Sequence, residues 1–485
     1  MIELNFQQKD NIGFQYIIDE LAPCSPYGEE RIKGMKPFTR EQKPELLRQL
    51  QNIQRVLENR DRCASAMDKL MHTFMCIKNI RKIAEKCCES TLNAIELFEV
   101  KRFLLESERM LPLFAEVNEA VCFDGITLKD TTEALELLDP EKNRVASFYI
   151  SDMYSQELRA IRKEKRALEE AIRRAEGEEK EELQAKRVLV AVEEEHEERK
   201  VRIMLSEQLR PFIPAMLHNM DAIAQIDLSV QKAALARRYG AVLPVITENQ
   251  VDFTEMTNPQ IADSLKKRGN SFTPISLALC EGATVITGAN MGGKSVAMKT
   301  VALNILLVHC GFFPFAKEAA CPIFDSMHII SEDLENTDRG LSSFGGEIVR
   351  FNEVLSHLDE GFAFIMLDEF ARGTNPDEGA AIVQAVTAYL NKKHAVTLLA
   401  THYDNVSDQA NAHYQVIGLK DLNVEELRAQ IAAVSGHVGV ELISKHMNYG
   451  LYRVEGKQNC PRDALNICRL LALNTEILEM IEKSY

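Results

Sequence analysis

The sequence predicts an α/β domain with a mainly parallel sheet in its C-terminal half, preceded by an all-α core with a long helical hairpin. Three observations lead to this expectation. Residues 1–150 carry apolar side chains at helical spacing, residues 151–240 are dense in charge of both signs, and residues 241–485 alternate short apolar runs with helical stretches. We therefore expect three parts with these boundaries, which suits a chain of 485 residues.

Residues 1–150 are expected to form a helical core domain. Apolar side chains recur at helical spacing in segments such as Leu46–Leu57 and Met67–Ile83. The dipeptide Asp139-Pro140 should end one of these helices, because proline cannot continue a helix and restricts the residue before it. The sequence leaves the path of the first 40 residues open.

Residues 151–240 are expected to form an antiparallel helical hairpin. Gly177, in the middle of EGEEKEE, is the natural turn, and a returning helix that Pro211 and Pro214 should bend follows it. A solvated charged helix with no special role is the alternative. One narrow apolar stripe runs through the otherwise charged first helix, at Leu158, Ile161, Leu168, Ile172 and Ala175.

Residues 241–485 show the pattern of an α/β domain. The runs ATVIT, FAFIML and AVTLLA are short and apolar, as in strands that are buried on both faces. Polar or glycine-bearing residues and helical stretches follow them, which predicts a mainly parallel sheet. The longest apolar run, Val301–Phe315, is too short for a membrane span and is expected to be a buried helix.

The composition narrows the class of protein. The formal net charge is -16, which argues against a surface that is basic all over but allows a local basic groove. The 11 cysteines form no C-x-x-C pair, and the N-terminus MIELNFQQKD has no basic start followed by an apolar stretch. These features predict free thiols in the cytoplasm, no signal peptide and no membrane partner.

The segment TGANMGGKSVAMKT carries the signal for phosphate binding. Gly288, Gly293, Lys294 and Ser295 fit G-x-x-x-x-G-K-[S/T] between a strand-like run and a helical stretch. The glycines let backbone N–H groups wrap a β-phosphate, and the helix N-terminus adds a favourable dipole. We expect Lys294 to reach the β- and γ-phosphate oxygens and Ser295 to bind Mg²⁺. The sequence therefore predicts a P-loop nucleotide-binding domain.

Two further strand-like runs end in chemistry-bearing residues. FAFIML is followed by Asp368-Glu369, where Asp368 is expected to hold Mg²⁺ and Glu369 to polarise the attacking water. AVTLLA is followed by Thr401-His402, where His402 is expected to contact the γ-phosphate; a loop histidine without nucleotide contact is the alternative. The carboxylate pair predicts ATP hydrolysis to ADP and phosphate as well as ATP binding.

A fourth segment, RGLSSFGGEIVRFNEVL, reads as the start of a helix. Ser342, Ser343, Gly345 and Gly346 precede a helical pattern that contains Glu347. This segment is either a second anion-binding helix terminus or an ordinary capped helix. Its position relative to the other motifs decides between the two, and the residues alone do not supply that position.

The four motifs, in this order, resemble those of the MutS family of DNA mismatch-repair ATPases. TGANMGGKS, GLSSFGGE, LDEFARGTNPDEG and ATHY are similar to that family's phosphate loop, signature helix, Mg²⁺-binding catalytic strand and switch histidine. MNYGLYRVEGKQNCPRDALNICRLLAL resembles, more loosely, its C-terminal stretch. CSPYGEERIKGMKPF and SQELRAIRKE resemble parts of its helical core and lever helices. The resemblance implies an ABC-like ATPase domain over 241–485 and lever helices over 151–240.

The resemblance also implies a homodimer in which each ATP lies between the phosphate loop of one subunit and the signature helix of the other. Ser342 would contact the γ-phosphate in trans, with Ser343 as the adjacent candidate, and Phe272 would stack on adenine. The residues implied to bind the nucleotide are Phe272, Gly288, Ala289, Asn290, Met291, Gly292, Gly293, Lys294, Ser295, Val296 and Ser342. Those implied to act in catalysis are Lys294, Glu369 and His402, with Ser295 and Asp368 on Mg²⁺.

The chain departs from the family's pattern in the parts that touch DNA. It begins almost directly at the helical core, so the mismatch-recognition and connector domains of the family have no counterpart in this sequence. About 15 residues around Gly177 connect the lever helices, which is too short for the family's β-rich clamp domain. The ATPase motifs are intact, while the known DNA-contacting parts are absent or reduced.

Two functions fit these features, and Glu369 argues against a third, a regulatory ATP sensor with little turnover. The first is a DNA-processing ATPase whose dimer embraces duplex or branched DNA between the arms. The second is an ATP-driven factor that remodels a protein partner, since short MutS-like chains also resemble ATPases that reactivate cobalamin-dependent aminomutases. For the first function, the arm cations that would contact DNA are Arg159, Arg162, Lys163, Lys165, Arg166, Arg173 and Arg174. Pairing of these cations with the abundant neighbouring glutamates is the alternative.

Overall fold

The chain folds into two compact units, which we describe separately. The computed structural model describes residues 2, 4–147, 149–288, 293–331, 343–418, 447–455, 468–470 and 473–484. The helical unit comprises Ala22–Met35 and Asn52–Ala233, and the sheet unit comprises Met1–Leu21, Lys36–Gln51 and Ala234–Tyr485. The chain passes from one unit to the other inside α4 (Lys43–Asn59) and inside α11 (Ile213–Tyr239). The division at residues 150 and 240 stays a prediction.

The helical unit is built from helices that pack around α7. Besides the shared helices, its elements are α3 (Pro26–Lys33), α5 (Ala64–Cys76), α6 (Arg81–Glu89), α7 (Ala94–Val121), α8 (Thr132–Leu138), α9 (Gln156–Ile172) and α10 (Glu178–Leu209). The expected helix end at Asp139-Pro140 is confirmed, because α8 ends at Leu138 and Asp139 caps it. A 3₁₀ turn at Arg210–Phe212 contains Pro211 and separates α10 from α11.

One expected helix is divided into two. The periodic segment Met67–Ile83 contains the end of α5 at Cys76 and the start of α6 at Arg81, with an extended backbone at Ile77. The buried Tyr27 hydroxyl binds this break, because it donates to the Lys78 carbonyl at 3.2 Å and accepts from the Ile80 N–H at 3.3 Å. A side chain from α3 thus satisfies backbone groups that a continuous helix would have paired internally.

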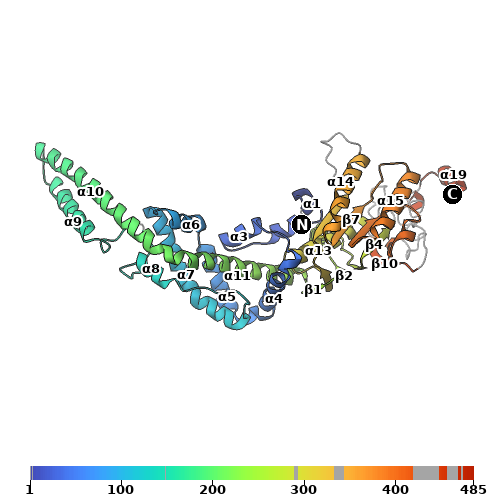
Figure 1. Cartoon of the computed structure of the whole chain (residues 1–485), viewed down its shortest axis with the longest axis horizontal. Coiled ribbons are helices and arrows are strands. Elements are labelled where there is room, and N and C mark those ends of the chain that lie inside the picture. Colours follow the sequence, from blue (N-terminus) through green and yellow to red (C-terminus); the bar gives the residue numbers. More distant parts are fainter. Residues whose placement is uncertain are drawn as a thin grey trace. The chain divides into compact units, whose positions relative to one another are not determined.

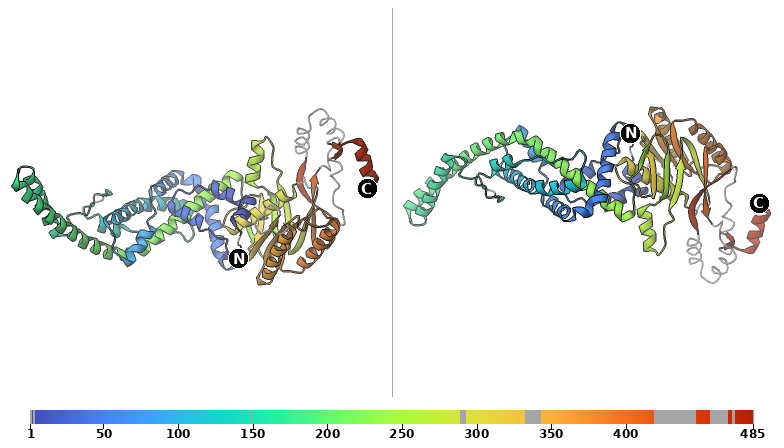
Figure 2. Two further views of the ribbon diagram at one scale, coloured as in Figure 1. Left: turned by 90° about the horizontal axis from the view of Figure 1, so that it is seen from above. Right: turned by 90° about the horizontal axis from the view of Figure 1, so that it is seen from below.

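Helices α9 and α10 form an antiparallel pair that lies side by side in every view (Figures 1 and 2). Gly177 provides the turn with a positive φ of 63°. Ion pairs join Arg162 to Glu194 and, nearer the turn, Glu169 to Arg187 at 2.9 Å. The partner residue number falls in α10 as it rises in α9, which is the register of a hairpin. Its action as a lever stays a prediction.

The sheet unit contains two β-sheets. The six-stranded sheet has the order β10-β9-β4-β8-β7-β6 and is parallel except for the β10–β9 pair. Its strands are β4 (Gly282–Thr287), β6 (Ser326–Ser331), β7 (Ala363–Asp368), β8 (Ala395–Ala400), β9 (Ala412–Gly418) and β10 (Asn448–Arg453). The expected strands ATVIT, FAFIML and AVTLLA correspond to β4, β7 and β8, so the mainly parallel sheet is confirmed.

A four-stranded sheet of order β1-β5-β2-β3 was not expected from the sequence. It contains β1 (Val245–Thr247), β2 (Val251–Met256), β3 (Ile275–Leu279) and β5 (Glu318–Pro322). Strand β2 pairs antiparallel with both β3 and β5. The strands that pair with each other in this sheet are separated by 18 or more residues, so no local turn signal predicts their pairing.

Helices cover the six-stranded sheet and bury its strands. A core cluster joins Val285, Ile365 and Leu399 on the strands to α14 (Ser343–His357) and α15 (Pro376–Leu390). Helix α13 (Lys294–His309) contacts β7 and β8 and contributes no residue to that cluster. The remaining helices of this unit are α1 (Phe6–Asn11), α2 (Phe14–Glu20), α12 (Pro259–Lys267) and α19 (Thr475–Ser484). In the described residues, no helix is long and apolar enough to cross a membrane.

Candidate functional site

The predicted site residues meet at the carboxyl ends of three neighbouring strands. Strand β8 lies between β4 and β7 and runs parallel to both. Gly288 follows β4, Asp368 ends β7 and His402 follows β8. Because parallel strands end at the same edge of a sheet, segments more than 70 residues apart converge there. Ligands of open α/β sheets bind at this edge.

The described part of the phosphate loop has the backbone that glycine permits. Gly288 has φ 151° and Gly293, which caps the N-terminus of α13, has φ 85°. Lys294 begins α13 with a buried side chain whose Nζ donates to the Gly288 carbonyl at 2.8 Å. The lysine therefore bridges the two ends of the loop. Ala289, Asn290, Met291 and Gly292 lie outside the described residues.

Asp368 and Ser295 form a pair that suits a divalent cation. The Ser295 hydroxyl is hydrogen-bonded to the Asp368 carboxylate, whose Oδ1 is buried and has no hydrogen-bond partner in the described part of the chain. Burial raises the pKa of Asp368, and the Glu369 carboxylate raises it further, while the Ser295 hydrogen bond and nearby lysines oppose the rise. A buried carboxylate oxygen beside a hydroxyl is a ligand set that Mg²⁺ accepts alongside phosphate oxygens and water.

Glu369 lies in an unusual backbone conformation next to the phosphate loop. Its φ is 53°, in the left-handed region that non-glycine residues rarely adopt, and Ala371 follows with φ 62°. Its carboxylate is 3.6 Å from Lys294 Nζ and accepts a hydrogen bond from Arg372 at 2.8 Å. Two cations therefore hold the carboxylate at the strand end. Backbone strain of this kind is found mainly at functional sites.

His402 and Tyr403 extend the site beyond β8. His402 is exposed, and the centre of its ring lies 4.4 Å from the centre of the Tyr403 ring. Loss of solvation lowers the pKa of His402; Glu369 raises it, and Lys294 and Arg372 lower it, so its imidazole feels the charges of the site. The Tyr403 hydroxyl donates to the Ala371 carbonyl at 3.0 Å, which fixes the segment after Glu369.

The structure does not bring every predicted residue to this edge. Phe272 is half-buried between α12 and β3, and no hydrogen bond or ring contact among the described residues joins it to the phosphate loop. Val296 lies next to the site, in the first turn of α13, and its carbonyl accepts from Thr300. Ser342 lies outside the described residues, and α14 begins at Ser343. The roles of these residues stay predictions.

Three contacts of the site were not anticipated from the sequence. A Cβ on Gly293 would lie 2.8 Å from the Tyr449 ring, and one on Gly288 would lie 3.0 Å from Val416, so β10 and β9 pack against both ends of the phosphate loop. The buried Glu347 of α14 accepts from the Ala371 N–H at 2.9 Å. Tyr449 lies in the segment MNYGLYR of the sequence, but its position beside the phosphate loop depends on the pairing of β10 with β9.

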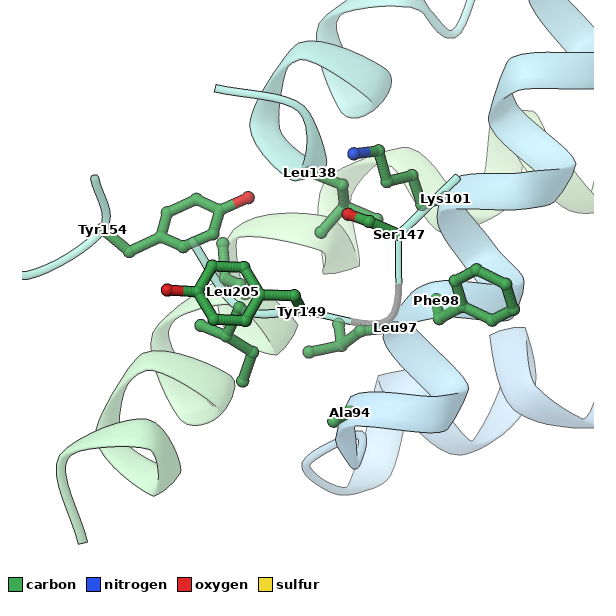
Figure 3. Close-up of a pocket in the computed structure, with 10 residues that line it drawn as sticks. Ala94, Leu97, Phe98, Lys101, Leu138, Ser147, Tyr149, Tyr154 and Leu205 are labelled. Atoms are coloured by element: carbon green, nitrogen blue, oxygen red, sulfur yellow. The ribbon is translucent and has the colours of Figure 1, made fainter. Parts of the chain in front are cut away.

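A hollow in the helical unit is too small to bind a ligand larger than water. Its volume is about 30 Å³, enough for one or two water molecules. Figure 3 shows residues that line it, among them Tyr149, Tyr154, Leu205 and Lys101. The Lys101 amine is not available to a ligand, because it pairs with the buried Asp139 carboxylate at 3.0 Å. In the described residues, no group of three or more His, Cys, Asp and Glu side chains is arranged to hold a metal ion.

Comparison with known proteins identifies the region that contains this site. Residues 284–472 match the family model of MutS domain V. Over 192 residues the chain is 34% identical to the DNA mismatch repair protein MutS of Natronomonas pharaonis, which covers 39% of this chain and 22% of that protein. The predicted resemblance to the MutS family is thereby confirmed.

Two further relatives carry the name Endonuclease MutS2. The protein of Latilactobacillus sakei subsp. sakei is 30% identical over 214 residues, or 44% of this chain and 27% of that protein. The protein of Symbiobacterium thermophilum is 27% identical over 253 residues, or 52% of this chain and 31% of that protein. The chain thus spans less than a third of the length of each curated relative that it matches here.

Proposed function

The chain carries a MutS domain V, and on this premise we propose that it is a Mg²⁺-dependent ATPase that works as a homodimer on DNA. The observation that supports this proposal is the convergence of Lys294, Asp368, Glu369 and His402 at neighbouring strand ends. A phosphate-binding lysine, a metal-binding aspartate and a glutamate that activates water are the parts that ATP hydrolysis requires.

Each residue has a separate role in the proposed reaction. The backbone of Gly288–Ser295 wraps the phosphates, and Lys294 moves from the Gly288 carbonyl and Glu369 toward the β- and γ-phosphate oxygens. Glu369 orients and polarises the attacking water, and His402 contacts the γ-phosphate. Phe272 stacks on the adenine ring.

Ser295 and Asp368 would hold Mg²⁺, which would neutralise charge on the phosphate oxygens. The unpartnered Oδ1 of Asp368 supports this assignment, because a buried carboxylate oxygen without a hydrogen bond is costly unless a ligand satisfies it. The hydrogen bond between Ser295 and Asp368 also joins the phosphate loop to the end of β7.

The proposed dimer completes each site with Ser342 of the other subunit. Glu347, in the helix that begins just after this serine, binds the Ala371 N–H, so α14 and the segment after Glu369 form one connected structure. Engagement of the γ-phosphate by Ser342 in trans would therefore affect the catalytic strand of the subunit that supplies this serine, and so couple the two sites of the dimer. ATP binding closes the dimer and moves the α9–α10 hairpin.

DNA contact is supported by a basic face on α9. Arg159, Lys163 and Arg166 follow at i, i+4 and i+7 and lie on one side of the helix, interrupted further on by Glu170. In the described chain no ion pair involves Arg159, Lys163, Arg173 or Arg174. Cations that carry no counter-charge of their own are suited to DNA phosphates.

A protein substrate is the second candidate, because the rest of the arm is internally neutralised. Arg162 pairs with Asp152, Glu194 and Glu198, and Lys165 pairs with Glu194. Arg166 also contacts Asp152 at 3.4 Å, so three of the seven expected DNA-binding cations already have an acidic partner. In this second function the ATP-driven arms remodel a partner, such as a cobalamin-dependent aminomutase that needs reactivation.

The ATPase rate and DNA affinity separate the two functions. Plain, mismatched and branched duplexes are each tested at two salt concentrations. The proteins compared are the wild type, the double variant Arg159→Glu/Lys163→Glu and a control variant, Lys69→Glu, which changes an exposed lysine on α5. The DNA function predicts ATPase stimulation and a salt-steep affinity that the double variant weakens about tenfold or more, with a salt slope lower by about two. Absence of DNA binding at low salt would sink the DNA function and leave the protein-directed one.

A further inference from the structure

Helix α10 carries an apolar stripe that the helical unit leaves uncovered. Val188, Leu189 and Val192 are 59%, 66% and 64% exposed, and Ala185 is exposed beside them. We call these residues the outer stripe: Ala185, Val188, Leu189 and Val192. Their spacing of i, i+3, i+4 and i+7 places all of them on one face of the helix.

The outer stripe lies opposite the face that α10 already buries. Val190 and Val201 are 6% and 3% exposed and belong to the side that packs within the helical unit. At 3.6 residues per turn this buried side points about 150° away from the centre of the outer stripe. Helix α9, in contrast, has one apolar face and a basic outer face. A continuous exposed apolar stripe on a helix marks an interaction site.

Charges of opposite sign flank the outer stripe at its two ends. Exposed acidic residues precede it on the same face: Glu178, Glu181 and Glu182. Exposed basic or titratable residues follow it on the same face: His196, Arg199 and Lys200. Arg199 has no ion-pair partner among the described residues, while Lys200 makes a surface contact with Glu197 at 2.9 Å. The face therefore reads acidic, apolar, basic along the helix.

This order is complementary to itself when reversed. Eighteen residues separate Glu181 from Arg199 and likewise Glu182 from Lys200. Eighteen residues are about five turns, so each acid and its base lie at the same angle around the helix. An antiparallel copy centred near Val190 brings Glu181 to Arg199, Glu182 to Lys200 and Val188 to Val192. A parallel copy would oppose like charges, which is unfavourable.

We propose that the outer stripe is a self-association surface that pairs antiparallel with the outer stripe of a second copy of this chain. Apolar contact supplies the affinity, and the two acid–base sets select the antiparallel register. This inference does not rest on the nucleotide site: the arm contact would persist in a protein that hydrolyses no ATP. Nucleic acid is a poor occupant for this face, because its centre is apolar and one of its ends is acidic.

Isotope-mixed cross-linking of the full-length protein tests which partner occupies the stripe. A photoreactive apolar amino acid replaces Val192 in chains labelled with ¹⁵N, which are mixed with unlabelled chains and illuminated without nucleotide. The proposal predicts links between labelled and unlabelled chains that map to α10 near Val188. Links to another segment of the same chain, links to the partner copy outside α10, or no link between chains would each overturn it.

Two sets of variants test the strength of the α10–α10 contact. Sedimentation equilibrium measures the self-association, and the yield of the cross-link from position 192 measures the contact itself. Leu189→Asp should weaken the α10 contact by about tenfold or more, because it places a charge on each side of an apolar centre. Met75→Asp on α5 is the matched control, since Met75 is 68% exposed and lies outside the stripe. Both variants should retain the wild-type melting temperature, so a loss confined to Leu189→Asp is not a folding defect.

Charge reversal tests the register. Glu181→Lys/Glu182→Lys and Arg199→Glu/Lys200→Glu should each lower the yield of the α10 cross-link in homogeneous preparations. An equimolar mixture of the two double variants should restore it. In the mixed pair one copy has two basic flanks and the other has two acidic flanks, so opposite charges face each other on both sides. The mixed pair is attractive in either orientation, whereas the quadruple variant, in which all four charges are exchanged, opposes unlike charges only in the antiparallel pair and should also restore the cross-link. Failure of the quadruple variant to recover the cross-link would overturn the antiparallel register.

Discussion

At the scale of single residues, the site is defined by carboxylates that the fold holds in costly positions. Glu369 has a left-handed backbone with φ 53°, and Asp368 is buried with one oxygen unpartnered. Each arrangement lowers the stability of the nucleotide-free protein, since strained backbone and unsatisfied polar atoms both cost free energy. Glu369 and Asp368 have different proposed roles, in water activation and in metal binding, and substitution of each should have a different effect.

Glu369→Gln should leave ATP binding nearly unchanged and reduce turnover by about 10²-fold or more, because the amide cannot accept the proton of the attacking water. Steady-state phosphate release measures the turnover, and equilibrium binding of ATP measures the affinity. Glu353→Gln, an exposed glutamate on α14, is the control and should keep full turnover. Equal turnover in wild type and Glu369→Gln would remove Glu369 from the proposed mechanism.

Asp368→Asn should raise the free energy of unfolding of the Mg²⁺-free protein at neutral pH by about 1 kcal/mol, because it removes a desolvated charge. Burial raises the pKa of Asp368 in the folded state above the value of about 3.9 expected for the unfolded chain. Wild-type stability from this group is therefore full below that unfolded value and is lost as pH rises through the folded pKa. The variant should gain on wild type across that window.

Urea unfolding at several pH values measures this difference. Added Mg²⁺ with ATP should stabilise wild type and have much less effect on Asp368→Asn, since a ligand that binds only the folded state adds stability. An Asp368→Asn protein that is less stable than wild type at neutral pH without Mg²⁺ contradicts the assignment of Asp368 as a strained metal ligand.

At the scale of elements, one buried arginine holds the base of the α9–α10 hairpin. The Arg162 guanidinium bonds to Glu194 at 2.9 Å, to Glu198 at 2.6 Å and to Asp152, and it lies 4.3 Å over the Tyr149 ring. Its partners belong to α10 and to the segment before α9. A hairpin that is otherwise charged and solvated thus gains a defined anchor where it joins the helical unit.

Arg162→Met should destabilise the hairpin by about 2–3 kcal/mol, because it leaves several half-buried carboxylates without their cation. The expected loss is smaller than for a fully buried ion pair, since water still reaches these carboxylates. Hydrogen exchange of the α9 amides measures the local opening. Arg166→Met is the control: Arg166 is 70% exposed and its pair with Asp152 at 3.4 Å should contribute little. Equal exchange rates in the two variants would contradict the anchor.

Acid should weaken the same anchor. Burial raises the pKa of Glu194, but hydrogen bonds from Lys165 and Arg162 outweigh it and leave the pKa below the usual range. Stabilisation from such a carboxylate is present above its unfolded pKa of about 4.3 and is lost as pH falls through the folded value. Exchange protection of α9 in wild type should therefore fall toward that of Arg162→Met below about pH 4.

At the scale of the whole molecule, the proposed homodimer makes each ATP site depend on two chains. Lys294→Ala and Ser342→Ala should each be inactive alone. In a mixed dimer, one site combines the intact Lys294 of one chain with the intact Ser342 of the other. Equal mixing gives mixed dimers in about half of the molecules, so about a quarter of wild-type activity should return.

Phosphate release from the equimolar mixture, after unfolding and joint refolding or prolonged exchange, measures this recovery. Mixing Lys294→Ala with Glu369→Gln is the control: both residues act on the same side of the site, so no intact site can form. Recovery in the control as well, or in neither mixture, would contradict a composite site that takes Ser342 in trans.

The sequence by itself determined the local chemistry of this protein. The spacing of Gly288, Gly293, Lys294 and Ser295 and the placement of Asp368 after an apolar run are local patterns, and local patterns specify strands, helix starts and turns. The strands β4, β7 and β8 and the turn at Gly177 were therefore expected where the structure has them.

Only the tertiary structure decided which distant segments meet. The break at Ile77 depends on Tyr27 of another helix, the contact of Tyr449 with Gly293 depends on the pairing of β10 with β9, and the four-stranded sheet joins segments without a local signal. The apolar side chains of VLVAV were visible in the sequence, but which of them α10 buries depends on its neighbours. Hydrophobic burial is non-directional, so the periodicity of a sequence predicts that a helix has an apolar face but not which segment packs against that face.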